Sequence, residues 1–200
     1  MSDLDNEYRK YCLNVGHLFT GFARLETLLS ACLRLHLMNN IDDSGDTNRP
    51  ARLAGAIYGG MRFKASRDVI KRVLKAEKAS ADLLQYVTDI FAQAGHIEDL
   101  RDKIAHQQVA PAHDDMDGYW QVSDHASTKD LTNIKFYVFD TKIIFDAALD
   151  LELVGESLAD RPITNRLFAG LTDFSPPAWR YKPSMLKLVP RSKLTAPPPP

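Results

Sequence analysis

Apolar side chains recur at steps of three and four residues over positions 6–38. The repeating positions are Leu18, Phe22, Leu25, Leu29 and Leu33. Because an α-helix has about 3.6 residues per turn, this spacing places all of them on one side of a helix. The pattern therefore predicts a long amphipathic helix with one face in the core.

The same period predicts three more helices, separated by residues that interrupt helices. Residues 39–50 are rich in Asn and Asp, include a glycine and end in a proline, which is typical of a loop. A short helix interrupted by glycines would then begin near Ala51, and an amphipathic helix follows over 62–76. The apolar period over 80–107 predicts a longer helix, which Gly95 would kink or break.

Two short runs, 119–123 and 133–139, are rich in aromatic and β-branched residues and are separated by a polar stretch. This pattern predicts a small antiparallel hairpin. After it, Asp140 or Thr141 would cap a last helix that ends near Leu158. The sequence therefore predicts a mainly α fold with a small β-hairpin.

After Arg161 the chain shows neither the helical nor the strand pattern of apolar residues, and it becomes rich in proline. It is also basic, because five Lys or Arg and no acid follow Asp173. Such a composition favours an extended, partly disordered segment. We therefore expect one helical domain over 1–160, including the hairpin near 117–139, followed by a Pro-rich basic tail over 161–200.

Composition narrows the class of protein. The 200 residues, 44% hydrophobic and 26% charged, are typical of a soluble globular domain and exclude collagen-like, disulfide-scaffold and wholly disordered chains. No apolar run approaches the ~18 residues of a membrane span. The polar N-terminus lacks the basic start and apolar stretch of a signal peptide. We expect a cytoplasmic protein without membrane contact, in which Cys12 and Cys32 stay reduced.

Positive charge is concentrated in one helix. Residues 62–78 carry seven Lys or Arg against two acids. At helical spacing, one face of this helix collects Lys64, Lys71, Lys75 and Lys78. Such a face suits the phosphate backbone of RNA, which it would contact without reading sequence. The alternative is an ordinary solvated helix face, because Asp68 lies within the stripe.

The segment LRDKIAH, residues 100–106, is the strongest candidate for chemistry. Asp102 and His106 are one helical turn apart, so the carboxylate can hydrogen-bond the imidazole and orient it for proton transfer. Arg101, whose planar guanidinium suits phosphate, points about 140° away from His106 around an ideal helix. The three side chains converge only through a distorted helix end or through a second copy of the chain across a two-fold axis.

This motif, an Arg, a polar residue directly after it and a His four positions further, resembles that of the HEPN superfamily. The resemblance covers roughly residues 6–110. It implies an HEPN-like antiparallel helical bundle, acting as a homodimer that cleaves RNA without metal. By position, it implies Arg101 as the phosphate and transition-state clamp, Asp102 as the orienting residue and His106 as general base or acid. A toxin or phage-defence setting, with an antitoxin or other protein as partner, is a further implication.

The chemistry implied is attack of the ribose 2′-hydroxyl on the adjacent phosphate, which requires no cofactor. Two alternatives remain open from the residues: a non-catalytic helical dimerisation or protein-interaction module, and a regulator that binds RNA without cleaving it. Glu26 would reach Arg101 or His106 if the first helix packs beside the motif, or else pair with a nearby base such as Arg24.

No metal or nucleotide cofactor is expected. The residues His96, His106, His113, His125 and the acids at 114, 115 and 117 form only a loose cluster in the sequence, without HxxxH, HExxH or CxxC spacing. Gly-rich phosphate-binding loops are also missing from the sequence.

Overall fold

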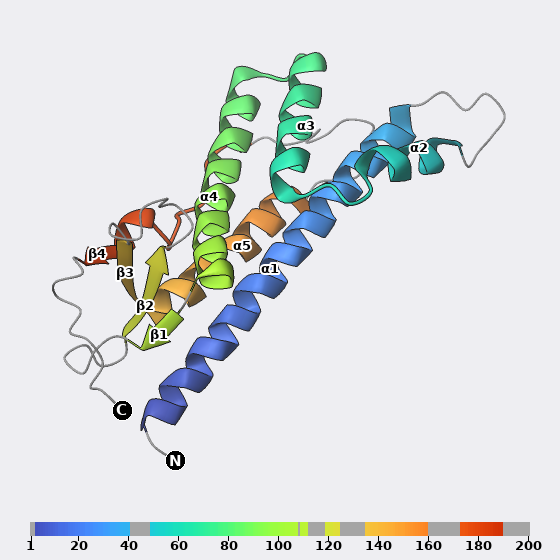
Figure 1. The fold of residues 1–200 in the computed structure, drawn as a ribbon. Coiled ribbons are helices and arrows are strands. Elements are labelled where there is room, and N and C mark those ends of the chain that lie inside the picture. The colour runs from blue at the N-terminus through green and yellow to red at the C-terminus, as the bar shows by residue number, and fades with distance from the viewer. Residues whose placement is uncertain are drawn as a thin grey trace. The chain divides into compact units, whose positions relative to one another are not determined.

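The computed structural model describes residues 3–40, 49–107, 109–111, 119–124, 135–159 and 173–189. Within these ranges the chain is mainly helical and has a small four-stranded antiparallel sheet (Figure 1). The elements follow in the order α1 (Asp3–Asn40), α2 (Arg49–Tyr58), α3 (Phe63–Ala76), α4 (Ala81–His106), β1 (Val109–Pro111), β2 (Tyr119–Asp124), β3 (Lys135–Asp140), α5 (Thr141–Ala159), the 3-10 helix η2 (Pro183–Met185) and β4 (Lys187–Val189). The predicted mainly α fold is confirmed.

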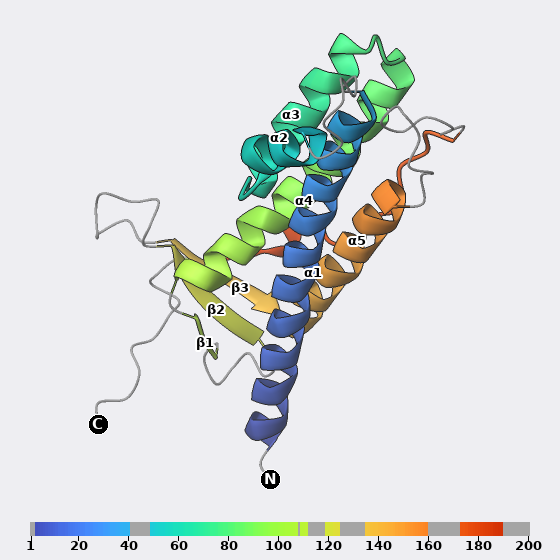
Figure 2. The same cartoon turned by 90° about the vertical axis from the view of Figure 1, so that its right-hand side faces the viewer.

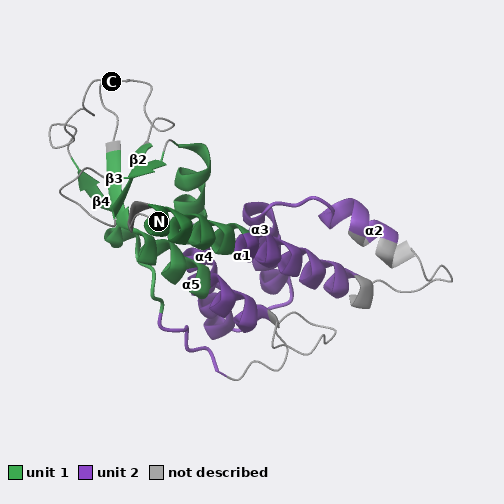
Figure 3. Cartoon of the chain, turned by 90° about the horizontal axis from the view of Figure 1, so that it is seen from below, with its two compact units in different colours: residues 1–19, 96–150, 179–200 green, residues 20–95, 151–178 purple. Residues whose placement is uncertain are grey.

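Two compact units share this chain (Figure 3). Unit 1 comprises Met1–Phe19, His96–Asp150 and Trp179–Pro200, and unit 2 comprises Thr20–Gly95 and Leu151–Ala178. The helices α1, α4 and α5 each contribute to both units, because the unit boundaries fall inside them. The segment expected as a separate tail instead contributes its residues 173–178 to unit 2 and 179–189 to unit 1.

The core of unit 2 contains three aromatic rings from three helices. The ring of Phe63 lies edge-on to Phe22, with centroids 5.4 Å apart, and to Phe91, at 6.1 Å. Figures 1 and 2 show α3 beside the first half of α4 in this unit. The apolar stripe predicted for the first helix is buried, including Leu25 and Leu29. Apolar periodicity therefore identified the faces that form this core.

The two ends of α3 are completed in different ways. The side chain of its N-cap residue, Arg62, makes no capping hydrogen bond. Instead, the carboxylate of Glu26 on α1 accepts a hydrogen bond from the Phe63 N–H at 2.9 Å. At the other end Lys78 has a φ of 57°, and the Ala79 N–H bonds the Leu74 carbonyl at 2.9 Å. A left-handed residue at this place closes many helices and is usually glycine.

The helix α4 begins where the sequence predicted and runs without a break. The Ser80 hydroxyl caps it by accepting a hydrogen bond from the Leu83 N–H at 3.2 Å. The predicted break at Gly95 is wrong, because the helix continues through this residue to His106. Apolar residues at helical spacing are buried on both sides of Gly95. Their burial stabilises the helix by more than the modest free-energy penalty of one glycine.

Unit 1 is built on the sheet, whose strand order is β1-β2-β3-β4. The predicted hairpin is confirmed as β2 and β3, with Trp120 opposite Phe139 and Val122 opposite Tyr137. From α1, the ring of Tyr11 stacks on Trp120 at 4.1 Å. The outer strands β1 and β4 were not predicted, because three residues are too few to show an alternating pattern.

A buried carboxylate joins α5 to the C-terminal segment in unit 1. Asp150 is fully buried, and its carboxylate oxygens accept hydrogen bonds from the Arg180 N–H at 3.0 Å and the Tyr181 N–H at 2.9 Å. Tyr181 is itself 1% exposed. These bonds hold the segment that leads into β4, so residues 179–189 are part of the unit and not a free tail.

Candidate functional site

The motif residues lie on the last turns of α4, in unit 1. Ile97, Leu100 and Ile104 are buried and fix the core side of this helix. Arg101 and Asp102 are half-buried, and His106 is exposed as the last residue of the helix. The predicted core stripe of the segment is thus confirmed, with the polar motif residues outside it.

The carboxylate of Asp102 binds Arg101. Its Oδ1 accepts hydrogen bonds from Arg101 Nε at 3.0 Å and from Nη2 at 2.6 Å. The sequence analysis expected Asp102 to orient His106 instead. The always-charged guanidinium of the neighbouring residue is a strong hydrogen-bond donor and can fold back onto this carboxylate. Asp102 therefore fixes the guanidinium of Arg101.

The imidazole of His106 makes no hydrogen bond or ion pair with any residue that the structure describes. The helix stays regular up to this residue, so a distorted helix end does not bring Arg101 and His106 together. In one chain the two side chains keep the wide angular separation of an ideal helix. The two side chains therefore do not converge within one chain.

Sequence reasoning missed Lys103 beside His106. The two residues are three positions apart, which places them on neighbouring parts of one helix face. The ammonium group of Lys103 lies 5.6 Å from the centroid of the Tyr137 ring on β3, a cation–π distance that ties the helix to the sheet. The i, i+3 spacing to His106 was the available signal.

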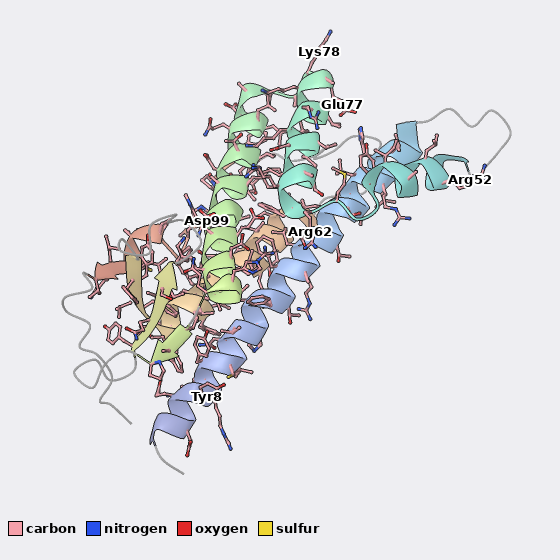
Figure 4. The ribbon with its side chains drawn as sticks, viewed as in Figure 1. Tyr8, Arg52, Arg62, Glu77, Lys78 and Asp99 are labelled. Atoms are coloured by element: carbon pink, nitrogen blue, oxygen red, sulfur yellow. The ribbon has the colours of Figure 1, made fainter. Side chains whose placement is uncertain are left out.

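The predicted RNA-binding lysines lie on α3 and at its end, in unit 2. Lys64, Lys75 and Lys78 are exposed, and Lys71 is half-buried. The motif and the lysines thus belong to different units. Figure 4 shows the side chain of Lys78 pointing away from the helices at the end of α3.

Other side chains considered from the sequence lie elsewhere. Glu26 is in unit 2, where its carboxylate caps the start of α3 as described above, whereas Arg101 and His106 belong to unit 1. His113, His125 and the acids at 114, 115 and 117 fall outside the described residues. In the ranges that are described, no three His, Cys, Asp or Glu side chains gather as metal ligands.

Comparison with known protein families, curated proteins and solved structures gives no match for this chain. None of the described helices combines the length and the apolar character that crossing a membrane requires.

Proposed function

We propose that the protein is a metal-independent endoribonuclease whose active site forms between two copies of the chain. The observation that carries the proposal is the exposed His106 at the end of α4, five residues after an Arg101 that Asp102 fixes. Exposure leaves the imidazole accessible to a polymer. The fixed guanidinium supplies a positioned positive charge for a phosphate.

In this mechanism His106 removes the proton from a ribose 2′-hydroxyl. The 2′ oxygen then attacks the adjacent phosphorus, and the bond to the 5′ oxygen breaks as that oxygen takes up a proton. The products are a 2′,3′-cyclic phosphate and a 5′-hydroxyl. Arg101 of the second copy stabilises the charge that develops on the phosphate, and Lys103 adds a second cation on the His106 side of the helix.

The expected activity is cleavage of single-stranded RNA in the presence of EDTA. His106→Ala should lower the cleavage rate by on the order of 10²- to 10⁴-fold, because general acid–base assistance has that magnitude. DNA of the same sequence should stay intact, since it lacks the 2′-hydroxyl. His96→Ala is the matched control, because it removes another exposed histidine from the same helix.

A mixing experiment tests the composite site. Arg101→Ala and His106→Ala should each be inactive alone, but mixed dimers contain one intact site. Equal mixing should restore about a quarter of the wild-type rate if a two-fold axis relates the copies. RNA left intact by the wild-type protein, or cleaved equally well by His106→Ala, would overturn the proposal.

The main alternative is a non-catalytic helical dimerisation or interaction module. The Arg101–Asp102 pair favours it, because a guanidinium already bound to a carboxylate contributes to local structure without any ligand. Under this alternative, Arg101→Ala changes the oligomeric state or the stability, while RNA stays intact with every variant.

A further inference from the structure

One flank of α3 carries an arginine and two lysines at four-residue steps: Arg67, Lys71 and Lys75, here called the basic cluster. Steps of four residues repeat about every 6 Å along a helix. The cluster spans a shorter part of the helix than the lysine stripe predicted from the sequence, and it includes an arginine that the stripe did not.

Both acids of residues 62–78 already have partners. Asp68 accepts a hydrogen bond from Arg67 Nε at 3.2 Å, and Glu77 Oε1 lies 3.2 Å from His36 Nε2 on α1. Among the described residues, no carboxylate lies within ion-pair distance of Lys71 or Lys75. The cluster therefore carries a local excess of positive charge.

The guanidinium of Arg67 is held in place but keeps open donors. Its side chain is only 24% exposed, and the guanidinium carbon lies 5.8 Å from the centroid of the Phe63 ring. Its Nη1 lies beside Gly95 of α4, where an added Cβ would be in ordinary van der Waals contact with it at 3.7 Å. In the described chain its two terminal nitrogens donate to no acceptor. A positioned guanidinium with free donors suits a phosphate.

The surroundings of Lys71 disfavour its positive charge in the free protein. Burial lowers its pKa from the usual 10.5, and the charges of Arg67 and Lys75 lower it further against the opposing charge of Asp68. Like charges at i, i+4 destabilise a helix. A bound anion would remove this repulsion.

We propose that the basic cluster binds the phosphodiester backbone of single-stranded RNA, with Arg67 clamping one phosphate and Lys71 and Lys75 contacting its neighbours. The choice of RNA as the polyanion rests on the proposed function. A lipid surface fits less well, because membrane-bound helices bury large apolar side chains. The large exposed apolar side chains of the described chain all lie outside α3.

The test is binding of the full chain to a fluorescent 2′-O-methyl oligouridylate, measured by anisotropy over a range of salt concentrations. This probe cannot be cut by 2′-hydroxyl attack, so binding is measured whether or not the protein is a nuclease. The double variant Lys71→Gln/Lys75→Gln should bind roughly tenfold more weakly, and the magnitude of its salt slope should fall by about 1.4. The single variant Lys75→Gln, at an exposed position, should show half the change in slope.

Arg72→Gln is the matched control, because it removes the same charge from an exposed position about 100° around α3 from Lys71, where Arg72 Nε donates to the Asp68 carbonyl. It should change affinity by less than about twofold. Equal losses for Arg72→Gln and the cluster variants, or unchanged binding by the double variant, would overturn the proposal. Binding to vesicles of phosphatidylserine without binding to the oligonucleotide would overturn it in favour of a membrane partner.

The two proposals fail separately. Loss of probe binding in the cluster variants, with no RNA cleavage by the wild-type protein, supports the cluster and rejects the nuclease. Cleavage that depends on His106, with probe binding unaffected by the cluster variants, supports the nuclease and rejects the cluster.

Discussion

Unit 2 and unit 1 hold their cores in different ways. In unit 2, aromatic rings from α1, α3 and α4 pack against one another around Phe63. In unit 1, hydrogen bonds join segments that are far apart in the chain: Asp150 binds the backbone of Arg180 and Tyr181, and β3 pairs with β4. Apolar packing tolerates adjustment, whereas a buried carboxylate with lost partners does not. We therefore expect the two units to respond to different perturbations.

The largest expected effect is in unit 1. Asp150→Ala removes the acceptor of two backbone N–H groups and should lower the free energy of unfolding by about 3 kcal/mol. Urea unfolding measures this change. Hydrogen exchange should show faster exchange in residues 180–189, with the amides of α3 unchanged.

Asp146→Ala is the control for this prediction, because its carboxylate, also buried and on the same helix, pairs with the exposed ammonium of Lys142. It should cost less than Asp150→Ala, because the Lys142 ammonium left behind can turn to water, whereas the backbone N–H groups of Arg180 and Tyr181 cannot. Equal stability of wild type and Asp150→Ala would show that unit 1 does not depend on this carboxylate.

A second effect concerns alkaline pH. Burial, followed by the charge of Asp99, raises the pKa of Tyr181 from 10.0 to about 12. Below pH 10 both states keep the proton, so stability is intact. Between pH 10 and 12 the unfolded chain loses the proton first, so the free energy of unfolding falls as pH rises, by about 2 kcal/mol in total.

Tyr181→Phe should flatten this decline in urea unfolding measured below pH 10 and near pH 12. Some decline should remain, because burial also raises the pKa of Tyr11 in the same unit to about 12. The same pH dependence in wild type and variant would contradict the assignment to Tyr181.

The smallest effect is a gain of stability in unit 2. Lys78 holds a left-handed conformation that glycine adopts without strain. Lys78→Gly should therefore raise the free energy of unfolding by ~1 kcal/mol. Lys75→Gly, inside the same helix, should lower it by a similar amount. A loss of stability in both variants would show that the Lys78 side chain stabilises the helix end.

Much of the secondary structure was predictable because it depends on neighbouring residues. The apolar stripe of the first helix predicted the burial of Leu18 to Leu33, and the aromatic runs predicted the pairing of β2 with β3. The position of the motif at the end of a long helix was also predictable. These features follow from helical and strand periods, which act over a few residues.

The candidate site was predictable only as a set of residues. That Asp102 binds Arg101 and not His106, and that Lys103 reaches the Tyr137 ring, depends on rotamers and on the packing of α4 against the sheet. Sequence spacing defines which side chains are within reach, but it does not decide which of several partners is chosen.

The sequence by itself determined the helices, the hairpin, the concentration of charge on α3 and the order of the motif residues. Only the tertiary structure decided that Glu26 completes α3, that Asp150 holds the C-terminal segment and that Arg67 belongs with the lysines. The physical reason is distance along the chain. Helices and turns follow from interactions between near neighbours, whereas these contacts join residues whose proximity exists only after the helices and strands have packed.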